Sequence, residues 1–314
     1  MGKLSGKDFI SIHDLTSSDI EEIFKLSSDL KEKQKKQEKH EYLWAKSLAM
    51  IFEKPSTRTR VSFEIGMWQL GGLAINLDQE AIGLGVRESV GDVAKTLSRY
   101  ADAILVRTFA HGKVIELARH ASIPVINGLS DLLHPCQALA DVFTIREKKG
   151  VEGLKGLKMA YIGDGNNVCH SLMFAAAKLG MNLVIAAPPG YEPKKEIVDL
   201  AFADGKMAGI ELDILNDPVV AAKDADVIYT DVWASMGKEK EAKKRKAAFK
   251  KFQVNAELVS LAKKGAIIMH CLPAHRGEEI TDDVLDGPQS VVFDQAENRL
   301  HVQKAILTLL LGGI

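Results

Sequence analysis

The sequence has few of the features that mark secreted, metal-binding or membrane proteins. It contains three cysteines in 314 residues, Cys136, Cys169 and Cys271, which are far apart and odd in number. No CxxC or Cys/His spacing accompanies them, so neither a disulfide framework nor a zinc site is predicted. Residues 1–15 include four charged side chains and lack the apolar core of a signal peptide. No apolar run reaches the roughly 18 residues of a membrane span. We therefore expect a cytoplasmic protein that does not bind a membrane.

An excess of one charge is also missing. The formal net charge is −1, whereas a nucleic-acid-binding protein normally carries a basic excess, so no nucleic-acid partner is predicted. A local arginine cluster for a small anion is still compatible with this balance. Hydrophobic residues make up 46% and charged residues 26%, as in a typical globular protein. A chain of this length is too long for one typical core and predicts two compact domains.

Short apolar runs alternate with helical patterns along the whole chain. Strands are predicted over residues 47–52, 73–77 and 103–106, with helices over residues 16–37, 60–70 and 89–100. The second half repeats the theme, with strands over 159–162, 183–186, 227–230 and 266–269. Such alternation is typical of parallel sheets joined by crossover helices. The predicted fold class is α/β, with two domains that each contain a parallel sheet flanked by helices. Gly150, Gly153 and Gly156 mark a plausible boundary between them.

The segment Ser56-Thr57-Arg58-Thr59-Arg60 has the chemistry of an anion site. It follows a predicted strand and Pro55, and it precedes a helix, whose first N–H groups carry partial positive charge. Three hydroxyl groups add donors, and Arg58 adds a planar fork suited to phosphate. A helix cap with two exposed arginines would explain the segment less well, because a cap needs only one hydroxyl. The pattern favours anion binding.

Two further segments carry side chains that could serve a ligand. In residues 134–141, Pro135 at the first helical position leaves His134 at the helix start, with Gln137 on the first turn. Taken alone, a histidine there is more often structural. Residues 270–279 begin at the carboxyl end of a predicted strand, where ligands bind in open α/β sheets. Cys271 lies there, either as a nucleophile or as a buried inert thiol.

With these motifs in place, the chain closely resembles the ornithine carbamoyltransferases, within the aspartate/ornithine carbamoyltransferase family. The resemblance is carried by STRTR at residues 56–60, HPCQALAD at 134–141 and HCLPAHRGEE at 270–279, and it extends over essentially the whole chain. It implies a carbamoyl-phosphate-binding domain over residues 1–148, to which residues 297–314 return as a C-terminal helix. An ornithine-binding domain would cover residues 149–296.

The resemblance also implies roles for individual residues. Carbamoyl phosphate would be bound by side chains or carbonyls of Ser56, Thr57, Arg58, Thr59, Arg107, His134, Gln137, Cys271, Leu272 and Arg299. Thr59, Arg107 and His134 would donate to the carbonyl oxygen of the reacting group. Ornithine would be bound by Asn167, Asp231, Ser235 and Met236, the last two in a Ser-Met-Gly segment that closes over the substrate. Arg107, His134, Asp231 and Cys271 would form the catalytic set, and the reaction would need neither a metal nor an organic cofactor.

Ornithine is the favoured acceptor because residues 231–237 and 163–167 look like the ornithine enzyme's versions of these segments. The family likeness further implies a homotrimer or an assembly of trimers. Many relatives place a glutamine where this chain has Gly83, so Gln79 or Arg87 would have to replace its contact with a neighbouring subunit. The basic residues 238–251 are expected to form a mobile, solvated helix rather than to steer the anion.

Three other functions are each compatible with part of the sequence. A nucleotide-binding oxidoreductase is suggested by Gly163 and Gly165 after a strand, but Val168 replaces the third glycine of the fingerprint. The second function is that of a non-catalytic homologue that binds carbamoyl phosphate. It is disfavoured because the charged residues of the motifs are intact. The third is a carbamoyltransferase with a different acceptor.

Overall fold

The computed structural model describes residues 3–78, 82–150, 154–206, 208–234 and 241–312. The chain folds into two compact units, Met1–Ala140 with Glu297–Ile314, and Asp141–Ala296. Each contains one parallel sheet, which confirms the predicted fold class. The unit boundary lies inside one helix, and the expected domain division at residues 148/149 lies at the far end of that helix and stays a prediction. In the part of the chain that the structure describes, no helix combines the length and apolar composition needed to cross a membrane.

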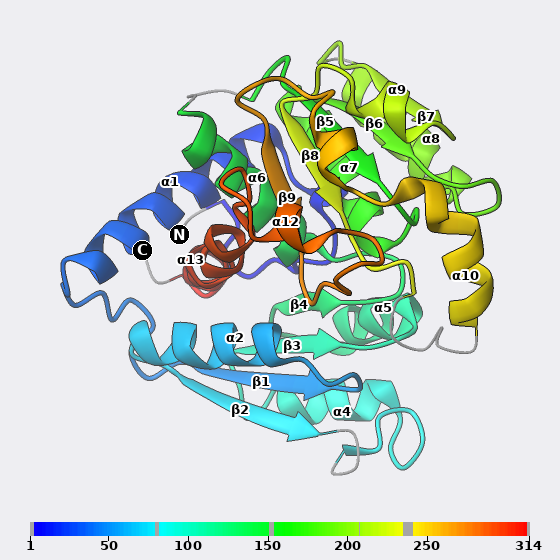
Figure 1. Ribbon diagram of the computed structural model, residues 1–314. Helices are drawn as coiled ribbons and strands as arrows, with labels where there is room; N and C mark the ends of the chain where they lie inside the picture. The colour runs from blue at the N-terminus through cyan, green and yellow to red at the C-terminus, as the bar shows by residue number, and fades with distance from the viewer. Residues whose placement is uncertain (1–2, 79–81, 151–153, 207, 235–240, 313–314) are drawn as a thin grey trace. The chain divides into compact units, whose positions relative to one another are not determined.

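The first unit is built on a four-stranded sheet with strand order β2-β1-β3-β4 (Figure 1). Its strands are β1 (Ser47–Phe52), β2 (Leu73–Asp78), β3 (Ala103–Arg107) and β4 (Val125–Leu129). Its helices are η1 (Ile12–Asp14), α1 (Ser17–Lys35), α2 (Thr57–Gln69), α4 (Val90–Leu97), α5 (His111–His120), the start of α6 (Pro135–Lys149) and most of α13 (Val292–Leu310). Apolar side chains of α4 and α5 pack on one sheet face, and α2 lies over the opposite face.

The second unit is built on a five-stranded sheet with strand order β7-β6-β5-β8-β9. Its strands are β5 (Lys158–Ile162), β6 (Asn182–Ala186), β7 (Leu212–Leu215), β8 (Val227–Thr230) and β9 (Ile267–His270). Its helices are α7 (Asn167–Leu179), α8 (Lys195–Lys206), α9 (Pro218–Ala222), α10 (Ala242–Phe249), η3 (Lys250–Phe252), α11 (Ala256–Val259) and α12 (Asp282–Leu285). The central strands are buried on both faces, which explains their nearly continuous apolar sequences.

Two helices begin earlier than the sequence pattern indicated. Helix α2 starts at Thr57 rather than near Arg60, because the Ser56 hydroxyl accepts a hydrogen bond from the Thr59 N–H at 3.2 Å and caps the helix. Helix α13 starts at Val292, five residues before the expected start at Glu297. Residues 297–314 belong to the first unit, as expected for the returning C-terminal helix.

Candidate active site

The anion cradle lies at the carboxyl edge of the first sheet. Strand β1 pairs with β3 in a register that sets Phe52 beside Arg107, so the loop leading to α2 and the Arg107 side chain leave the sheet at the same edge. Strand β4 is the next neighbour of β3, and the chain after it leads to His134 and α6. The parallel topology therefore gathers three segments that are far apart in sequence.

Helix α13 adds a buried arginine to this edge. Arg299 is 2% exposed and donates to Gln137 Oε1 at 2.5 Å and to Thr59 Oγ1 at 3.1 Å. Arg107 Nη1 lies 3.5 Å from the same Thr59 oxygen. Thr59 thus lies between two guanidinium groups at the start of α2. Four expected ligand residues, including Gln137, are in direct contact within the first unit.

His134 lies among the positive charges of this cluster. Burial, followed by the charges of Arg299, Arg107 and Arg58, holds the pKa of the His134 imidazole well below its usual value. The imidazole is therefore neutral near pH 7 and can donate one hydrogen bond without adding a charge. An anionic ligand would offset the positive charge that these arginines concentrate at the helix start.

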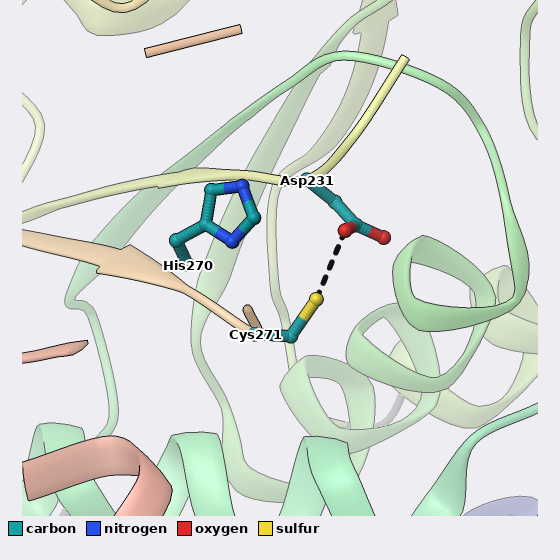
Figure 2. Close-up of side chains that lie close together, drawn as sticks. All are labelled: Asp231, His270 and Cys271. Carbon is teal, nitrogen blue, oxygen red and sulfur yellow. Dashed lines mark hydrogen bonds between the residues drawn. The ribbon is translucent and has the colours of Figure 1, made fainter. Parts of the chain in front are cut away.

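A second cluster lies at the carboxyl edge of the other sheet, where β5, β8 and β9 end side by side. Asp231 follows β8 directly and Cys271 follows β9. The Cys271 thiol donates to Asp231 Oδ1 across 3.0 Å, as Figure 2 shows. The same oxygen accepts from the Val232 N–H at 2.8 Å. Asp231 is 6% exposed, so its carboxylate is largely shielded from water.

The other oxygen of Asp231 is held by Asn166, a residue that was not among the predicted ligands. Asn166 donates from Nδ2 to Asp231 Oδ2 at 2.7 Å, and its own oxygen accepts from Val168 and Cys169 N–H groups as the cap of α7. The expected Asn167 is the first residue of α7 and is half-buried. Consecutive asparagines before a helix are a signal for a cap, but the sequence alone does not say which of them is the cap.

The three side chains in Figure 2 could also be considered as metal ligands. Ligand atoms of Asp231, His270 and Cys271 all lie within 4.8 Å of one another. However, His270 Nδ1 accepts from the Leu272 N–H at 2.8 Å, and Nε2 lies 3.0 Å from Glu279 Oε1. The Nδ1 contact requires the ring proton to be on Nε2, where it is donated to Glu279. Both ring nitrogens are thus engaged, and His270 is a structural support rather than a metal ligand.

A buried hydrogen-bond network holds the backbone at the end of β9. Asp141 accepts from Tyr229 Oη at 2.9 Å and from Gln295 Nε2 at 2.7 Å. The Gln295 oxygen accepts from the His270 backbone N–H at 3.0 Å. Burial and the Asp141 charge raise the pKa of the Tyr229 hydroxyl well above its usual value, so it stays a donor. The last residue of motif 134–141 therefore supports the strand that precedes Cys271.

The expectation that the basic run forms a solvated helix is wrong for one of its arginines. Within α10, Arg245 is 4% exposed and contacts Asp164 Oδ2 at 3.0 Å, while its Nη1 also donates to the Trp233 carbonyl at 2.8 Å. Lys243 and Lys244 are exposed. One arginine of the run is thus an internal support for the segment that follows Asp231.

The remaining expected residues are placed as follows. Leu272 is half-buried, has a positive φ of 57° and precedes a cis proline. Ser235, Met236 and Gln79 lie outside the described residues. Gly83 has a φ of +57°, and a Cβ there would lie 2.7 Å from the Arg87 Cβ, so a side chain would be strained at this turn. The backbone therefore gives its own reason for glycine, and the substitute for the expected glutamine stays a prediction.

Two domain models of one protein family match most of the chain. Residues 7–147 match the carbamoyl-P binding domain of aspartate/ornithine carbamoyltransferase, and residues 155–310 match its Asp/Orn binding domain. An ornithine carbamoyltransferase from Pyrococcus horikoshii is 56% identical over 311 residues, covering 99% of this chain and 98% of that protein. An anabolic ornithine carbamoyltransferase from Pyrococcus furiosus is 55% identical over 311 residues, with the same coverage.

Solved structures show the same similarity. The ornithine carbamoyltransferase from Pyrococcus furiosus matches with a TM-score of 0.96 at 54% identity, covering 100% of this chain and 99% of that one. The enzyme from Gloeobacter violaceus matches with a TM-score of 0.86 at 43% identity, covering 98% and 99%. Both domain descriptions and full-length relatives therefore agree with the geometry of the two clusters, and the chain belongs to the aspartate/ornithine carbamoyltransferase family.

Proposed function

We propose that the protein transfers the carbamoyl group of carbamoyl phosphate to the side-chain amine of L-ornithine, giving L-citrulline and phosphate. The observation that carries this proposal is the Asp231–Cys271 pair, in a chain whose other unit holds an arginine-rich anion cradle. A buried carboxylate is the group that recognises or deprotonates an ammonium. Relatives named ornithine carbamoyltransferase agree with ornithine as acceptor. The Pyrococcus furiosus relative, which is named anabolic, agrees with a place in arginine biosynthesis. The reverse reaction would serve arginine breakdown.

Carbamoyl phosphate would be bound in the first unit. In this proposal Ser56, Thr57, Arg58 and Thr59 hold the phosphate, where free N–H groups of α2 add partial positive charge. Arg107 bridges the phosphate and the carbamoyl group. Gln137 and Arg299 hold the carbamoyl amide, which their contact with each other supports.

The chemical step requires charge stabilisation on one oxygen. The amine of ornithine attacks the carbamoyl carbon and forms a C–N bond, and negative charge develops on the carbonyl oxygen. Thr59, Arg107 and His134 donate to that oxygen. The C–O bond to phosphate then breaks, phosphate leaves with the electron pair, and the amine gives up its extra proton. The attack needs a neutral amine, and in this proposal Asp231 with Cys271 orients the amine or accepts its proton.

The acceptor is tested by comparing four amines. With carbamoyl phosphate present, ornithine, putrescine, N-acetylornithine and aspartate would each be supplied, and the carbamoylated product would be measured by mass spectrometry. We expect product from ornithine at a kcat/KM far above that for the other three. Preferential carbamoylation of any of the other amines would overturn the acceptor assignment while leaving the carbamoyltransferase family assignment intact.

We also propose that the protein works in the cytoplasm as a homotrimer or an assembly of trimers. Helix α2 exposes Val61, Ile65 and Trp68 along one stripe, and the edge strand β2 exposes Leu73 and Ile75. Several exposed apolar side chains on neighbouring elements support contact with another copy. Light scattering after size-exclusion chromatography would test this: we expect a multiple of three chains, and a Trp68→Lys variant of lower mass. A monomeric wild-type protein would refute the proposed assembly.

A further inference from the structure

The guanidinium of Arg299 is held by more than the expected ligand residues. Its Nη1 and Nη2 groups donate to Gln137 and Thr59, both of which belong to the proposed carbamoyl phosphate site. The opposite edge of the guanidinium, formed by Nε and the second Nη2 hydrogen, faces Gln303. Arg299 and Gln303 are four residues apart on α13, so their side chains lie on the same helix face.

The orientation of the Gln303 amide follows from the chemistry of its neighbour. A guanidinium has only donors, so the amide must present its oxygen to Arg299. In that orientation the oxygen accepts from Arg299 Nη2 at 2.9 Å and from Nε at 3.1 Å. Gln303 is fully buried, so no water competes for these bonds. The amide oxygen therefore holds the guanidinium at its Nε–Nη2 edge, opposite the Nη1 group that donates to Gln137.

The nitrogen of the same amide reaches the cradle helix. It donates to Ser62 Oγ on α2 and to the Arg299 carbonyl at 3.3 Å. Ser62 in turn donates to the Arg58 carbonyl at 2.6 Å. A hydroxyl accepts one bond while it donates another, so the amide, the hydroxyl and the carbonyl form a continuous chain. This chain links the position of Arg299 to the first turn of α2.

We propose that Gln303 is a positioning residue for carbamoyl phosphate, acting through Arg299 and, by way of Ser62, through the start of α2. This rests on the proposed function and deepens it. A free arginine side chain loses rotamer freedom when it binds a ligand. Gln303 orders the Arg299 guanidinium before the ligand binds. The other N–H groups of Arg299 therefore already point toward Gln137 and Thr59. The benefit is expected in carbamoyl phosphate binding rather than in ornithine binding.

The test replaces Gln303 by Met, which has a similar volume but cannot accept from Arg299. We expect the KM for carbamoyl phosphate to rise about tenfold, which corresponds to roughly 1.4 kcal/mol. The kcat should change by less, and the ornithine KM at saturating carbamoyl phosphate should stay constant. The matched control is Thr308→Val, which removes a buried hydroxyl bond to the Lys304 carbonyl on the same helix, away from Arg299. It should leave the carbamoyl phosphate KM unchanged.

A second variant and a binding measurement complete the test. Ser62→Ala should also raise the carbamoyl phosphate KM, and the double variant with Gln303→Met should show no further rise, since both changes break one chain. If Gln303→Met does not fold, Ser62→Ala alone decides. Calorimetric titration with inorganic phosphate measures the cradle without turnover, so it separates this proposal from the acceptor assignment. An unchanged KM and phosphate affinity in folded Gln303→Met, or strictly additive effects, would overturn the role of Gln303.

Discussion

Lys304 offers a quantitative test of how the first unit is packed. Its ammonium is fully buried and donates to Gln34 and Gln69, each at 2.8 Å. It also lies 3.1 Å from Nε2 of His40. The other ring nitrogen of His40, Nδ1, contacts the Glu38 carbonyl at 2.8 Å. These three partners are neutral oxygen or nitrogen atoms, so burial is not offset by a carboxylate among them. Burial accordingly lowers the pKa of Lys304 to about 8.

The size and sign of the effect follow from linkage. The pKa is 10.5 in the unfolded chain and about 8 in the fold, and this gap corresponds to about 3 kcal/mol against the protonated form. Between pH 8 and 10.5 the unfolded chain binds more protons than the folded one, so the stability contributed by this group rises with pH. The penalty is fully present below pH 8 and is lost above 10.5.

The perturbation is Lys304→Met, followed by urea unfolding of the wild type and the variant from pH 7 to pH 10.5. The variant loses both the penalty and its three hydrogen bonds, each worth about 1 kcal/mol, so the two proteins should have similar stability at pH 7. As pH rises, the wild type should gain about 3 kcal/mol relative to the variant. Lys195→Met, which removes an exposed ammonium beside Asp199, is the control and should show no such change. If the difference in unfolding free energy between wild type and Lys304→Met stays constant with pH, the pKa of Lys304 is not lowered by burial.

Three further predictions concern the site itself. Arg58→Ala should raise the carbamoyl phosphate KM by about 10- to 150-fold, the equivalent of a charged hydrogen bond of 1.5–3 kcal/mol; an unchanged KM would remove Arg58 from the phosphate site. Asn166→Ala should cost about 1 kcal/mol of stability as a lost cap and raise the ornithine KM, because Asn166 also holds Asp231. The control, Asn255→Ala, removes the cap of α11 and should cost similar stability with an unchanged ornithine KM; equal KM values in both variants would contradict the role of Asn166. The pH–rate profile should rise toward alkaline pH, because the ornithine amine must lose a proton before it attacks. It should show no histidine inflection between about pH 6 and 8, because the pKa of His134 is held well below its usual value. A flat alkaline limb, or an inflection in that range that His134→Gln abolishes, would contradict this.

Much of the fold could be predicted because the buried strands have an unambiguous pattern. Apolar runs such as the one that forms β1 are bounded by turn residues and are too short for a helix. Helix ends were less predictable, since they depend on local caps and on packing. The hydroxyl of Ser56 starts α2 three residues before the expected position, and α13 begins at Val292 rather than at the expected Glu297.

The family resemblance, rather than the local sequence, assigned Arg107 and Asp231 to the candidate site. In the structure both lie where a parallel strand ends, at the carboxyl edge of its sheet. Supporting groups were not predictable, because their roles depend on which distant element they meet. Asn166 and Arg245 show this, because nothing in their local sequence indicates Asp231 or Asp164 as the partner. For Gln303 the contact with Arg299 follows from helical spacing, but the contact with Ser62 on α2 does not.

The central claim is that one carbamoyl group moves from carbamoyl phosphate to ornithine on this protein. The most direct measurement supplies carbamoyl phosphate labelled with ¹³C at the carbonyl carbon, together with ornithine, and follows citrulline and phosphate at the same time. We predict one labelled citrulline for each phosphate released, with both products appearing only when ornithine is present. Release of phosphate without labelled citrulline, or citrulline without the label, would contradict the account.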